Sequence, residues 1–392
     1  MGIGNSLSDR KNAKILIVGA GIAGLTAAII LGKSGIAVTV VERDAEMRGG
    51  GFLVSLSDAA YQVAQELGIL TPLQQMVHRI ERSSYHDRTG TRLLALEYDR
   101  LFGQVAVIQP MRNDVAQCLS DIATAHADIQ LNASIVALSQ DGEGVDVTFS
   151  DGRQDRFTAV IGADGVHSIT RKLAFAPSDI RNHDLGLFCA AYRCDNRLNL
   201  NREFRTYMER HRYMATFSTA PDQIGCVFVW AERAQAPPAD GPGRASLLKN
   251  AFQDSSPQSQ AALEHCPQDR AFYMDRLSQI ELTNWYQGRV SLVGDAAHCL
   301  TLFSGRGAAA AMVGAAHLAK ELVIYIHDPM QAFASYQGAQ KSKIDAMQKA
   351  TRDAVKWYVP QRGTIEFARN NAMRWLPRLV FENYFQAKYT TV

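Results

Sequence analysis

The sequence predicts an α/β fold in which a parallel sheet of the Rossmann type is interleaved with a mainly antiparallel second domain and followed by C-terminal helices. Three observations predict it. A strand, a glycine-rich turn, a helix and another strand follow one another over residues 13–42. Two more buried-strand patterns, each ending in aspartate, occur at residues 158–164 and 290–295. Between them, residues 183–233 alternate apolar and polar side chains, as antiparallel strands do.

Composition sets the limits within which this fold must function. The 392 residues, 47% of them apolar and 20% charged, are typical of a globular enzyme of two or three domains. A net charge of +2 is too small to favour a nucleic-acid partner. The six cysteines show no zinc-ligand spacing, so we expect reduced thiols, a cytoplasmic protein and no metal site. Residues 15–32 carry no charge and are long enough for a membrane span, but their glycine spacing favours a βαβ turn.

The elements can be predicted in chain order. Residues 1–12 are polar and unpatterned, which indicates a disordered arm. The run AKILIVG is a buried strand, the following apolar helix extends to about Lys33, and the strand IAVTVVE ends at Glu42. A strand, helix and strand in this order form a βαβ unit, which implies parallel pairing.

The middle and the end of the chain alternate between both kinds of sheet. The stretch SDAAYQVAQELGI is a helix with Ser57 at its N-cap, and strands are expected around residues 92–109. Short alternating strands over residues 127–150 indicate antiparallel pairing, and residues 330–358 predict a long helix. The tail from residue 362 is amphipathic and aromatic. We expect it to pack back onto the first domain, with a dimer contact or membrane-surface association as alternatives.

The first βαβ unit carries a phosphate-binding signature. Gly19, Gly21 and Gly24 form GxGxxG between the strand and the helix. The first glycine permits a tight turn, the second lets the backbone approach a pyrophosphate, and the third lets the helix pack closely. Glu42 ends the second strand, where an acidic side chain accepts hydrogen bonds from a ribose. The motif predicts an adenine dinucleotide without separating NAD from FAD, and Arg43 is either a contact to that ligand or a surface charge.

Two later strands end in an aspartate as well. Asp164 and Gly165 follow a buried strand in VIGADGVHSITRK, where the carboxylate either accepts hydrogen bonds from the ligand or caps the next helix. Asp295 follows the strand VSLV, and a second helix start comes soon after it. There, Gly305 and Gly307 leave backbone N–H groups free to face an anion.

In this order, GAGIAGL, ER, GADGVHS and GDAAH with a following GxG resemble the class A flavin-dependent aromatic monooxygenases of the p-hydroxybenzoate hydroxylase type. The loop RGGGFLVSLSDAAYQVAQELGIL and the helix start MRNDVAQCL are similar to the tetracycline-inactivating branch of that family. The division that this resemblance implies is an FAD-binding domain of residues 13–75, 100–180 and 285–330, a substrate domain of residues 76–99 and 181–284, and a C-terminal helical segment of residues 331–392.

The resemblance also implies a set of site residues. Those assigned to FAD are Gly19, Gly21, Gly24, Glu42, Arg43, Arg112, Asp164, Gly165, Asp295, Gly305 and Gly307. Arg112 and Asp295 are expected at the ribityl and diphosphate region. The helix beginning near Gly307 is expected at the pyrimidine edge of the flavin, where a helix N-terminus stabilises negative charge. Arg48 is a candidate contact for the reductant, NADPH or NADH.

The chemistry that the resemblance implies is carried by the cofactor. NAD(P)H reduces FAD, O2 forms a flavin C4a-hydroperoxide, and one oxygen atom is transferred to an aromatic or polyketide-like small molecule, as in secondary metabolism or antibiotic inactivation. No catalytic acid or base can be named, and His298 is expected to be a structural or flavin-edge residue rather than a catalytic one. A mostly apolar pocket under the second sheet must exclude water. Its candidate lining residues, each of which is otherwise plain core, are Phe188, Tyr192, Phe217, Phe228 and Trp230.

One loop departs from the family pattern. The family usually has proline at one or both positions of Thr301 and Leu302, and often glutamine at Arg306. Without proline the loop is less constrained and gains an N–H group. We expect FAD binding to survive this change, but the sequence does not predict whether the loop still stabilises the flavin hydroperoxide. Two alternatives follow: a protein whose FAD is a scaffold for a non-redox step such as cyclisation or for binding a small molecule, and a flavin reductase or dehydrogenase. The chain is expected to act as a monomer or a homodimer.

Overall fold

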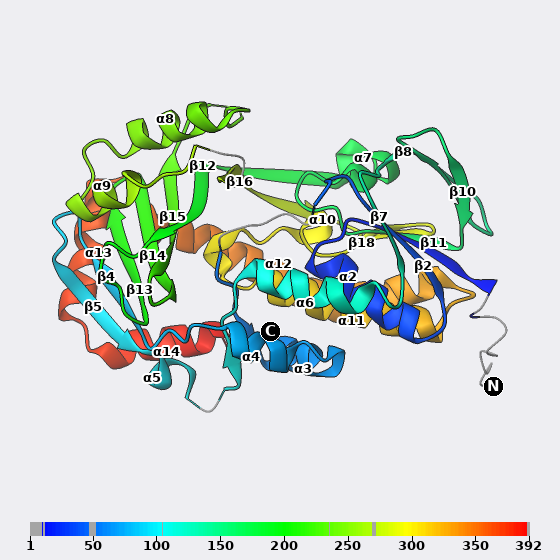
Figure 1. The fold of residues 1–392 in the computed structure, drawn as a ribbon, viewed down its shortest axis with the longest axis horizontal. Coiled ribbons are helices and arrows are strands. Elements are labelled where there is room, and N and C mark those ends of the chain that lie inside the picture. Colours follow the sequence, from blue (N-terminus) through cyan, green and yellow to red (C-terminus); the bar gives the residue numbers. More distant parts are fainter. Residues whose placement is uncertain are drawn as a thin grey trace.

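The computed structural model describes residues 10, 12–46, 52–103, 105–234, 236–268 and 272–389. Two sheets occupy opposite ends of an elongated molecule, and helices from several parts of the chain run between them (Figure 1). This is the predicted fold class: a parallel Rossmann-like sheet, a mainly antiparallel sheet and C-terminal helices. The predicted N-terminal arm lies outside the described residues apart from residues 10 and 12.

The first sheet has six strands in the order β17-β18-β11-β1-β2-β7. Their bounds are Tyr286–Gln287, Val290–Leu292, Ala159–Gly162, Lys14–Val18, Ala37–Glu42 and Asp128–Leu131. Every neighbouring pair is parallel except β17 with β18. Parallel strands share one carboxyl edge, so the polar residues that follow β1, β2, β11 and β18 lie along the same edge of this sheet.

Both faces of the first sheet are covered. Ile15 and Ile17 of β1 pack into the helix layer, whereas Leu16 and Val18 pack against a small antiparallel sheet. The helix layer contains α2 (Ile22–Lys33), α6 (Arg112–Ala123) and α11 (Gly307–Ile324), seen in Figure 1 below the strands. The small sheet contains β8 (Ile135–Gln140), β9 (Val145–Phe149) and β10 (Gln154–Phe157). Burial on both faces explains why β1 is a continuous apolar run.

Helix α11 is long and apolar enough to cross a membrane by length and composition. It packs against α2, α3 (Asp58–Leu67) and α12 (Pro329–Tyr358), and most of its apolar residues are buried. In this fold it is a core helix, which is the other kind of segment that passes the same hydropathy test.

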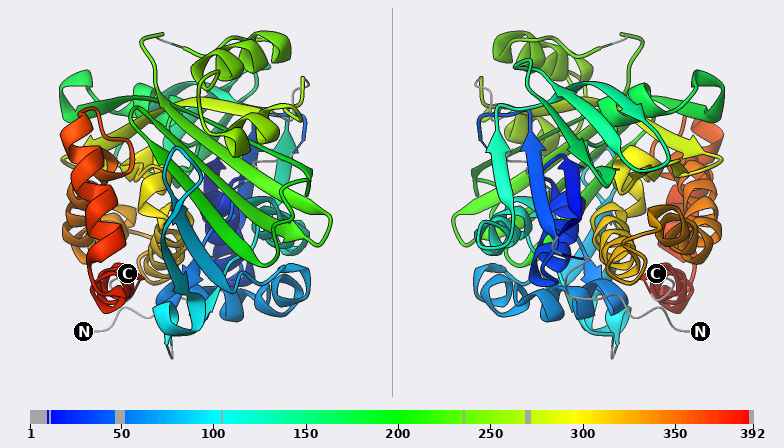
Figure 2. Two further views of the ribbon diagram at one scale, coloured as in Figure 1. Left: turned by 90° about the vertical axis from the view of Figure 1, so that its left-hand side faces the viewer. Right: turned by 90° about the vertical axis from the view of Figure 1, so that its right-hand side faces the viewer.

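The second sheet has seven strands in the order β16-β12-β15-β14-β13-β4-β5. Their bounds are Tyr273–Leu282, Ile180–Asp195, Gln223–Ala231, Arg212–Ala220, Glu203–Glu209, Arg82–His86 and Arg92–Glu97. Only β13 with β4 is parallel among its pairs. Helices α8 (Gly241–Ala251) and α9 (Pro257–Leu263) cover its outer face, and its inner face turns toward the first sheet and the C-terminal helices (Figure 2).

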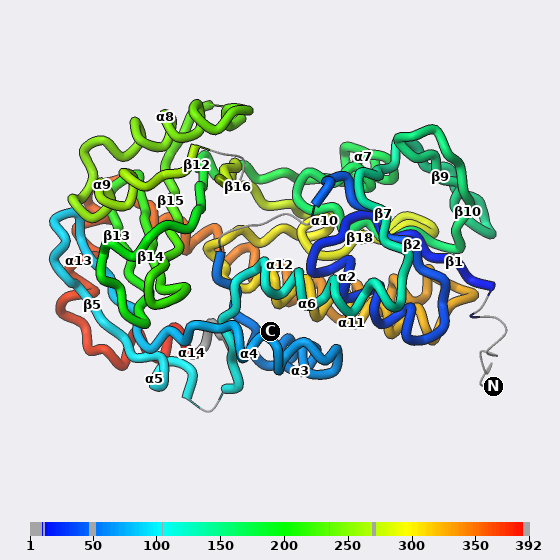
Figure 3. The backbone as a smooth tube through the Cα atoms, in the orientation of Figure 1, coloured from blue at the N-terminus to red at the C-terminus, as the bar shows by residue number. Residues whose placement is uncertain are grey.

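Three helices end the chain: α12 (Pro329–Tyr358), α13 (Gly363–Trp375) and α14 (Arg378–Tyr389). The tail was expected to pack on the first domain, but this is wrong: it packs mainly on the second sheet. Phe385 stacks on Tyr85 of the second sheet with ring centroids 6.0 Å apart, and α14 contacts α5 (Tyr98–Phe102) and β5. The remaining elements are β3 (Leu56–Ser57), β6 (Val107–Ile108), α4 (Leu70–Met76), α7 (Ile169–Ala174), α10 (Asp295–His298) and two short 3₁₀ turns, Pro177–Asp179 and Leu302–Ser304. Figure 3 traces these connections.

Two local predictions differ from the structure. Strand β7 was expected to pair antiparallel with its successors, but it joins the parallel sheet beside β2. Its alternation is the same in either arrangement, so the pattern does not fix the partner. Strands were expected over residues 92–109, where helix α5 separates β5 from β6.

Candidate functional site

The turn between β1 and α2 has the geometry that was expected from the three glycines of GxGxxG. Gly19 adopts φ +107°, and its N–H donates to the Val41 carbonyl at 2.7 Å. A Cβ on Gly24 would lie 1.9 Å from the Gly19 carbonyl oxygen, so the helix reaches the strand only without a side chain there. A Cβ on Gly21 would meet no protein atom within 4 Å. The turn therefore leaves open space beside Gly21, where a ligand can approach the backbone.

Glu42 ends β2 and folds back toward this turn. Its carboxylate accepts from the backbone N–H of Ala20 at 3.0 Å and from that of Asp44 at 3.1 Å. Both oxygens keep a free lone pair for a ribose hydroxyl. Arg43 is exposed beside it, and Arg48 lies outside the described residues.

Asp164 follows β11 and caps helix α7. Its carboxylate accepts from the backbone N–H groups of Ile169 at 2.8 Å and Thr170 at 2.9 Å, and from the hydroxyl of Ser168 at 2.5 Å. Of the two readings of this residue, the geometry favours the helix cap. Gly165, with φ +76°, turns the chain into that cap.

A buried arginine, which sequence reasoning gave no role, joins the second motif to the third. Arg171 donates to the Ala296 carbonyl at 2.8 Å and to the Val166 carbonyl at 2.6 Å. It therefore fixes α10 relative to the loop after β11. Burial lowers the pKa of Arg171. Arg171 and Ala296 are 125 residues apart in the chain, so no local sequence pattern indicates this link.

Asp295 lies where two helix N-termini meet. Gly294, with φ +63°, is wedged between α2 and α11: a Cβ there would lie 3.2 Å from the Ala23 Cβ and 3.3 Å from the Ala311 Cβ. This packing places Gly294, the residue before Asp295, against the first turn of α2 and the second turn of α11, near helix starts whose leading N–H groups have no intrahelical acceptor. The first glycine-rich motif and the motif at Asp295 thus converge, as predicted from a shared ligand.

Asp295 is exposed to solvent, but many protein atoms lie around its carboxylate. This enclosure raises the pKa of Asp295, while the Arg112 charge and a hydrogen bond with the Cys299 thiol act in the opposite direction. An accessible but enclosed carboxylate is the arrangement expected at the bottom of a ligand cleft. Arg112 is exposed and begins α6, so it lies close enough to act on Asp295 electrostatically.

The loop after α10 carries backbone strain. Thr301 has φ +65° and ψ 164°, a conformation that is rare for a β-branched residue. Its buried hydroxyl has no hydrogen-bond partner among the described residues. Its N–H donates toward the Cys299 sulfur, and that bond acts to lower the pKa of the thiol, which burial raises. A proline at this position would have neither this φ nor this donor.

Helix α11 begins at Gly307, two residues after Gly305, which adopts φ +67°. A Cβ on Gly307 would meet nothing within 4 Å, so the helix start is open to a ligand as the start of α2 is. Between the two glycines, Arg306 is buried, and its N–H donates to the Ser304 hydroxyl at 3.1 Å. The first turn of α11 can face an anionic group without steric hindrance.

His298 is structural in this arrangement. Its Nε2 lies 3.4 Å from the Tyr336 hydroxyl, and its ring packs on Trp285 with centroids 4.7 Å apart. Burial lowers the pKa of His298 to about 4, so the ring is neutral at physiological pH. This agrees with the structural role expected for it.

The aromatic residues proposed as pocket walls lie on two different faces. Tyr192, Phe228 and Trp230 pack under α8 and α9 on the outer face of the second sheet, and the Tyr192 hydroxyl donates to the Ala262 carbonyl at 2.8 Å. Phe188 packs edge-on against Trp230 on that face. These four side chains belong to the core under α8 and α9. They share this face because alternate residues of a strand point to the same side of the sheet. Phe217 alone lies on the inner face.

The inner face supplies other apolar side chains near the first domain. Phe52 packs edge-on against Tyr273 with centroids 5.2 Å apart, and its carbonyl accepts from the Arg112 N–H at 2.9 Å. Phe303, from the loop after α10, packs against Tyr213 at 5.5 Å. These contacts place an apolar wall of the second sheet opposite the Asp295 loop.

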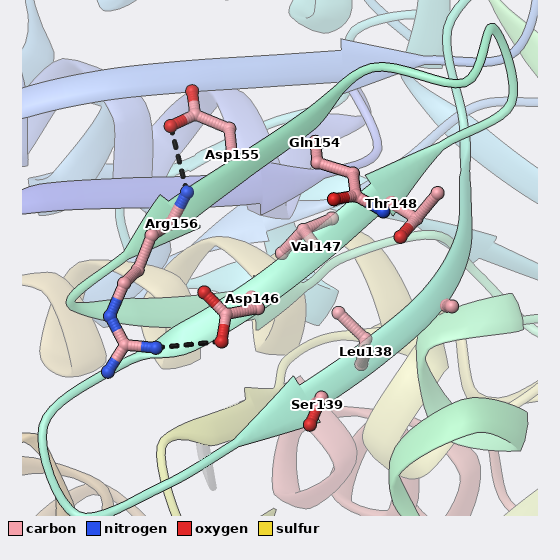
Figure 4. A pocket seen from close by; sticks show the side chains of 9 residues that line it. Leu138, Ser139, Asp146, Val147, Thr148, Gln154, Asp155 and Arg156 are labelled. Carbon is pink, nitrogen blue, oxygen red and sulfur yellow. Dashed lines mark hydrogen bonds and ion pairs between the residues drawn. The ribbon is translucent and has the colours of Figure 1, made fainter.

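Two surface depressions lie elsewhere. One, of about 410 Å³, is on the small sheet (Figure 4), where Arg156 pairs with Asp146 at 2.8 Å and with Asp141 at 2.7 Å. The other, of about 360 Å³, lies between His211 and helix α8. Neither is lined by a residue predicted to bind the cofactor, and only Trp230 of the aromatic residues predicted for the substrate pocket borders the second one. We therefore assign the site from the converging motifs instead.

Comparison with known proteins supports this assignment. A family model described as an FAD binding domain matches residues 12–338. A flavin-dependent monooxygenase from Legionella longbeachae is 30% identical over 344 residues, which are 86% of this chain and 88% of that protein. An FAD-dependent urate hydroxylase from Mycolicibacterium vanbaalenii is 27% identical over 335 residues, 84% of this chain and 85% of the hydroxylase.

Solved structures show the same fold over nearly the whole chain. The tetracycline destructase Tet(51) superposes with a TM-score of 0.79 at 27% identity, covering 97% of this chain and 98% of its own. HpxO from Klebsiella pneumoniae, complexed with FAD and uric acid, has a TM-score of 0.84 at 20% identity and 99% coverage of both chains, a likeness of fold. The chain belongs to the FAD-binding domain family and, within it, to the class A flavin-dependent monooxygenases, with FAD as its cofactor.

Proposed function

We propose that this flavin-dependent monooxygenase uses NADPH or NADH as its reductant and hydroxylates an aromatic or polyketide-like small molecule with O2. Bound FAD would supply the redox chemistry, accepting a hydride and activating oxygen. The similarity to a tetracycline destructase and to a urate hydroxylase supports a ring-shaped, electron-rich substrate. We also propose that the protein acts in the cytoplasm, as a monomer or a homodimer.

The observation that carries this proposal is the position of Gly294 between α2 and α11. It brings two helix N-termini and the Asp295 carboxylate to one place, so one extended ligand can contact all three. The helix N-termini suit a diphosphate at α2 and the electron-rich end of a reduced flavin at α11. Asp295 and Glu42 are then placed to accept hydrogen bonds from the hydroxyl groups of the ribityl chain and of the ribose.

We propose the division into an FAD-binding domain and a substrate domain that the resemblance implies. Residues 13–75, 100–180 and 285–330 would hold FAD, and residues 76–99 and 181–284 would hold the substrate. The inner face of the second sheet, with Phe217 and Tyr213, supplies the apolar wall that keeps water from the reacting atoms. Arg43, Arg112, Gly165 and Gly305 remain proposed FAD contacts, and Arg48 remains a proposed contact to NADPH or NADH.

The test is a reduction assay on the purified protein. Bound FAD is confirmed by its absorbance, and the consumption of NADPH and NADH is followed with and without tetracycline, urate and 4-hydroxybenzoate. We expect one nucleotide to be consumed faster when a suitable ring compound is present, with a product heavier by one oxygen in mass spectrometry. If neither nucleotide reduces the flavin under any of these conditions, the reductant in the proposal is wrong and FAD has a scaffold role.

A further inference from the structure

The corner between α13 and α14 exposes an unusual amount of apolar surface. Trp375 is 77% exposed and Phe367 is 72% exposed. The six exposed apolar side chains of this corner, here called the C-terminal corner, are Phe367, Trp375, Leu376, Leu379, Val380 and Tyr384. Scattered exposed hydrophobic residues are ordinary, but a contiguous group of large ones marks an interaction surface.

Helix periodicity shows that the exposure is not a fraying end. In α14, Phe381 and Phe385 point inward and are buried, whereas Leu379, Val380 and Tyr384 lie on the opposite side. A helix that is apolar on both sides is expected to be buried on both sides. Among the described residues, the covered side of α14 is the one that packs on α5, β4 and β5.

Helix α13 continues the same surface. Met373 and Arg369 face the protein and are buried, while Phe367 and Trp375, two turns apart, share the outer side. Trp375 ends α13 and Leu379 begins the outward face of α14, so the two helices contribute to the corner from both sides of the turn at Pro377. Figure 2 shows both helices at one edge of the molecule.

The exposed charges beside the corner, Arg374 and Arg378, are positive, whereas the acidic side chains of the two helices, Glu366 and Glu382, are half-buried. Arg374 and Arg378 flank Trp375 and are exposed. Arg374 lies 3.5 Å from Asp87 with nearly half of its side chain in solvent, and Arg378 makes no ion pair within the described part of the chain. Tryptophan and leucine on an apolar face, bordered by arginine, are the composition of helices that lie in a membrane interface.

We propose that the C-terminal corner docks on the surface of an anionic lipid bilayer, with its apolar side chains in the interface and its arginines at the headgroups. The charge pattern decides between the two possible occupants. In a two-fold contact with a second copy, Arg374 and Arg378 would meet the same arginines across the interface, and like charges disfavour that pairing. Anionic headgroups instead complement both arginines.

The experiment measures vesicle binding of the full FAD-loaded protein. Co-sedimentation with vesicles of phosphatidylcholine alone is compared with vesicles containing 30% phosphatidylglycerol. We expect binding to the anionic vesicles at least tenfold stronger, falling about fivefold for each arginine removed in Arg374→Gln and Arg378→Gln. The double variant Trp375→Ser with Leu379→Ser is expected to lose binding to both vesicle types.

Two matched controls test the location. Val136→Ser removes an exposed apolar side chain at the other end of the molecule, and Arg197→Gln with Arg210→Gln removes two exposed charges outside the corner. Both are expected to bind like the parent protein. FAD content and thermal unfolding, measured for every variant, report folding independently. Equal binding to neutral and anionic vesicles, binding unchanged in the Trp375 and Leu379 variant, or a dimer in light scattering that this variant abolishes would each overturn the proposal.

Discussion

At the scale of single residues, two aspartates that each follow a buried strand have different roles. Asp164 accepts four hydrogen bonds, from the backbone N–H groups of Ile169 and Thr170 and from the hydroxyl groups of Ser168 and Thr170, so its carboxylate stabilises the protein itself. Asp295 is exposed to solvent yet enclosed, and enclosure raises its pKa. A carboxylate in that position is costly for the protein alone and useful once a ligand donates hydrogen bonds to it.

Substituting each aspartate by alanine separates these roles. We expect Asp295→Ala to weaken FAD binding about 10- to 100-fold, the range for a charged hydrogen bond, with little change in the unfolding free energy of the apoprotein. Asp164→Ala is expected to lower that free energy by about 1 kcal/mol through loss of the cap. Flavin fluorescence titration and urea unfolding measure the two quantities. Full FAD occupancy in Asp295→Ala would contradict the assignment.

The strained loop gives a second pair of variants. Thr301 has φ +65°, which proline with its φ near −65° cannot adopt, whereas Leu302 is the first residue of a 3₁₀ turn, where proline is well tolerated. We expect Thr301→Pro to lower the unfolding free energy by about 3 kcal/mol and Leu302→Pro to change it by less than about 1 kcal/mol. Urea unfolding of both apoproteins checks this, and the reverse order would show that the loop has another conformation.

At the scale of elements, the turn from β1 to α2 distinguishes a glycine needed for packing from one needed for a ligand. Gly21 has an ordinary φ of −82° and space around it, so Gly21→Ala is expected to leave the apoprotein as stable as the parent while weakening FAD binding at least tenfold. Gly24→Ala forces a Cβ to within 1.9 Å of the Gly19 carbonyl, and we expect a loss of about 3 kcal/mol of stability. Thermal unfolding with and without FAD measures both effects.

The junction of α10 with α12 is expected to respond to acid. Burial lowers the pKa of His298 from 6.5 to about 4, so the unfolded chain binds this proton more tightly than the folded one. The contribution of His298 to stability is therefore complete above pH 6.5 and is lost as the pH falls toward 4, by about 3 kcal/mol at most. Urea unfolding between pH 7 and pH 4.5 should show a steeper fall for the parent protein than for His298→Phe. Parallel pH profiles would mean that the histidine is not buried as described.

Which parts of these elements could be predicted depends on how local their causes are. The βαβ turn, the Asp295 turn and the helix at Gly307 depend on spacings within short stretches, and the sequence predicts them with their residues. The link from Arg171 to Ala296 spans 125 positions and leaves no periodic trace. The pocket residues fail for a related reason. Both faces of β12 and β15 are buried, so alternation cannot show that α8 and α9 cover the side of Tyr192 and Trp230.

At the scale of the whole molecule, the C-terminal helices form a clamp on the edge of the second sheet. Its centre is Arg369, a fully buried arginine that donates to the Met208 carbonyl at 2.9 Å and to the Trp357 carbonyl at 3.2 Å. It thus joins α13 to β13 and to the end of α12. Burial lowers the pKa of Arg369 to about 10, so it stays charged at physiological pH. Because the Met208 carbonyl is buried together with the arginine, it needs this donor.

We therefore expect Arg369→Met to release the clamp without opening the FAD-binding half. The buried Met208 carbonyl and the partly buried Trp357 carbonyl would lose their donor, which costs about 2 to 4 kcal/mol in total. Stability is not uniform within a protein, and a peripheral pair of helices can open locally. Hydrogen exchange should therefore become faster in α13, α14 and β5, while β1, β11 and α2 keep their protection and FAD stays bound. Arg369→Lys, which retains one charged donor, should fall between the two. Uniform loss of protection in both sheets would instead mean that the clamp and the FAD-binding half unfold as one cooperative unit.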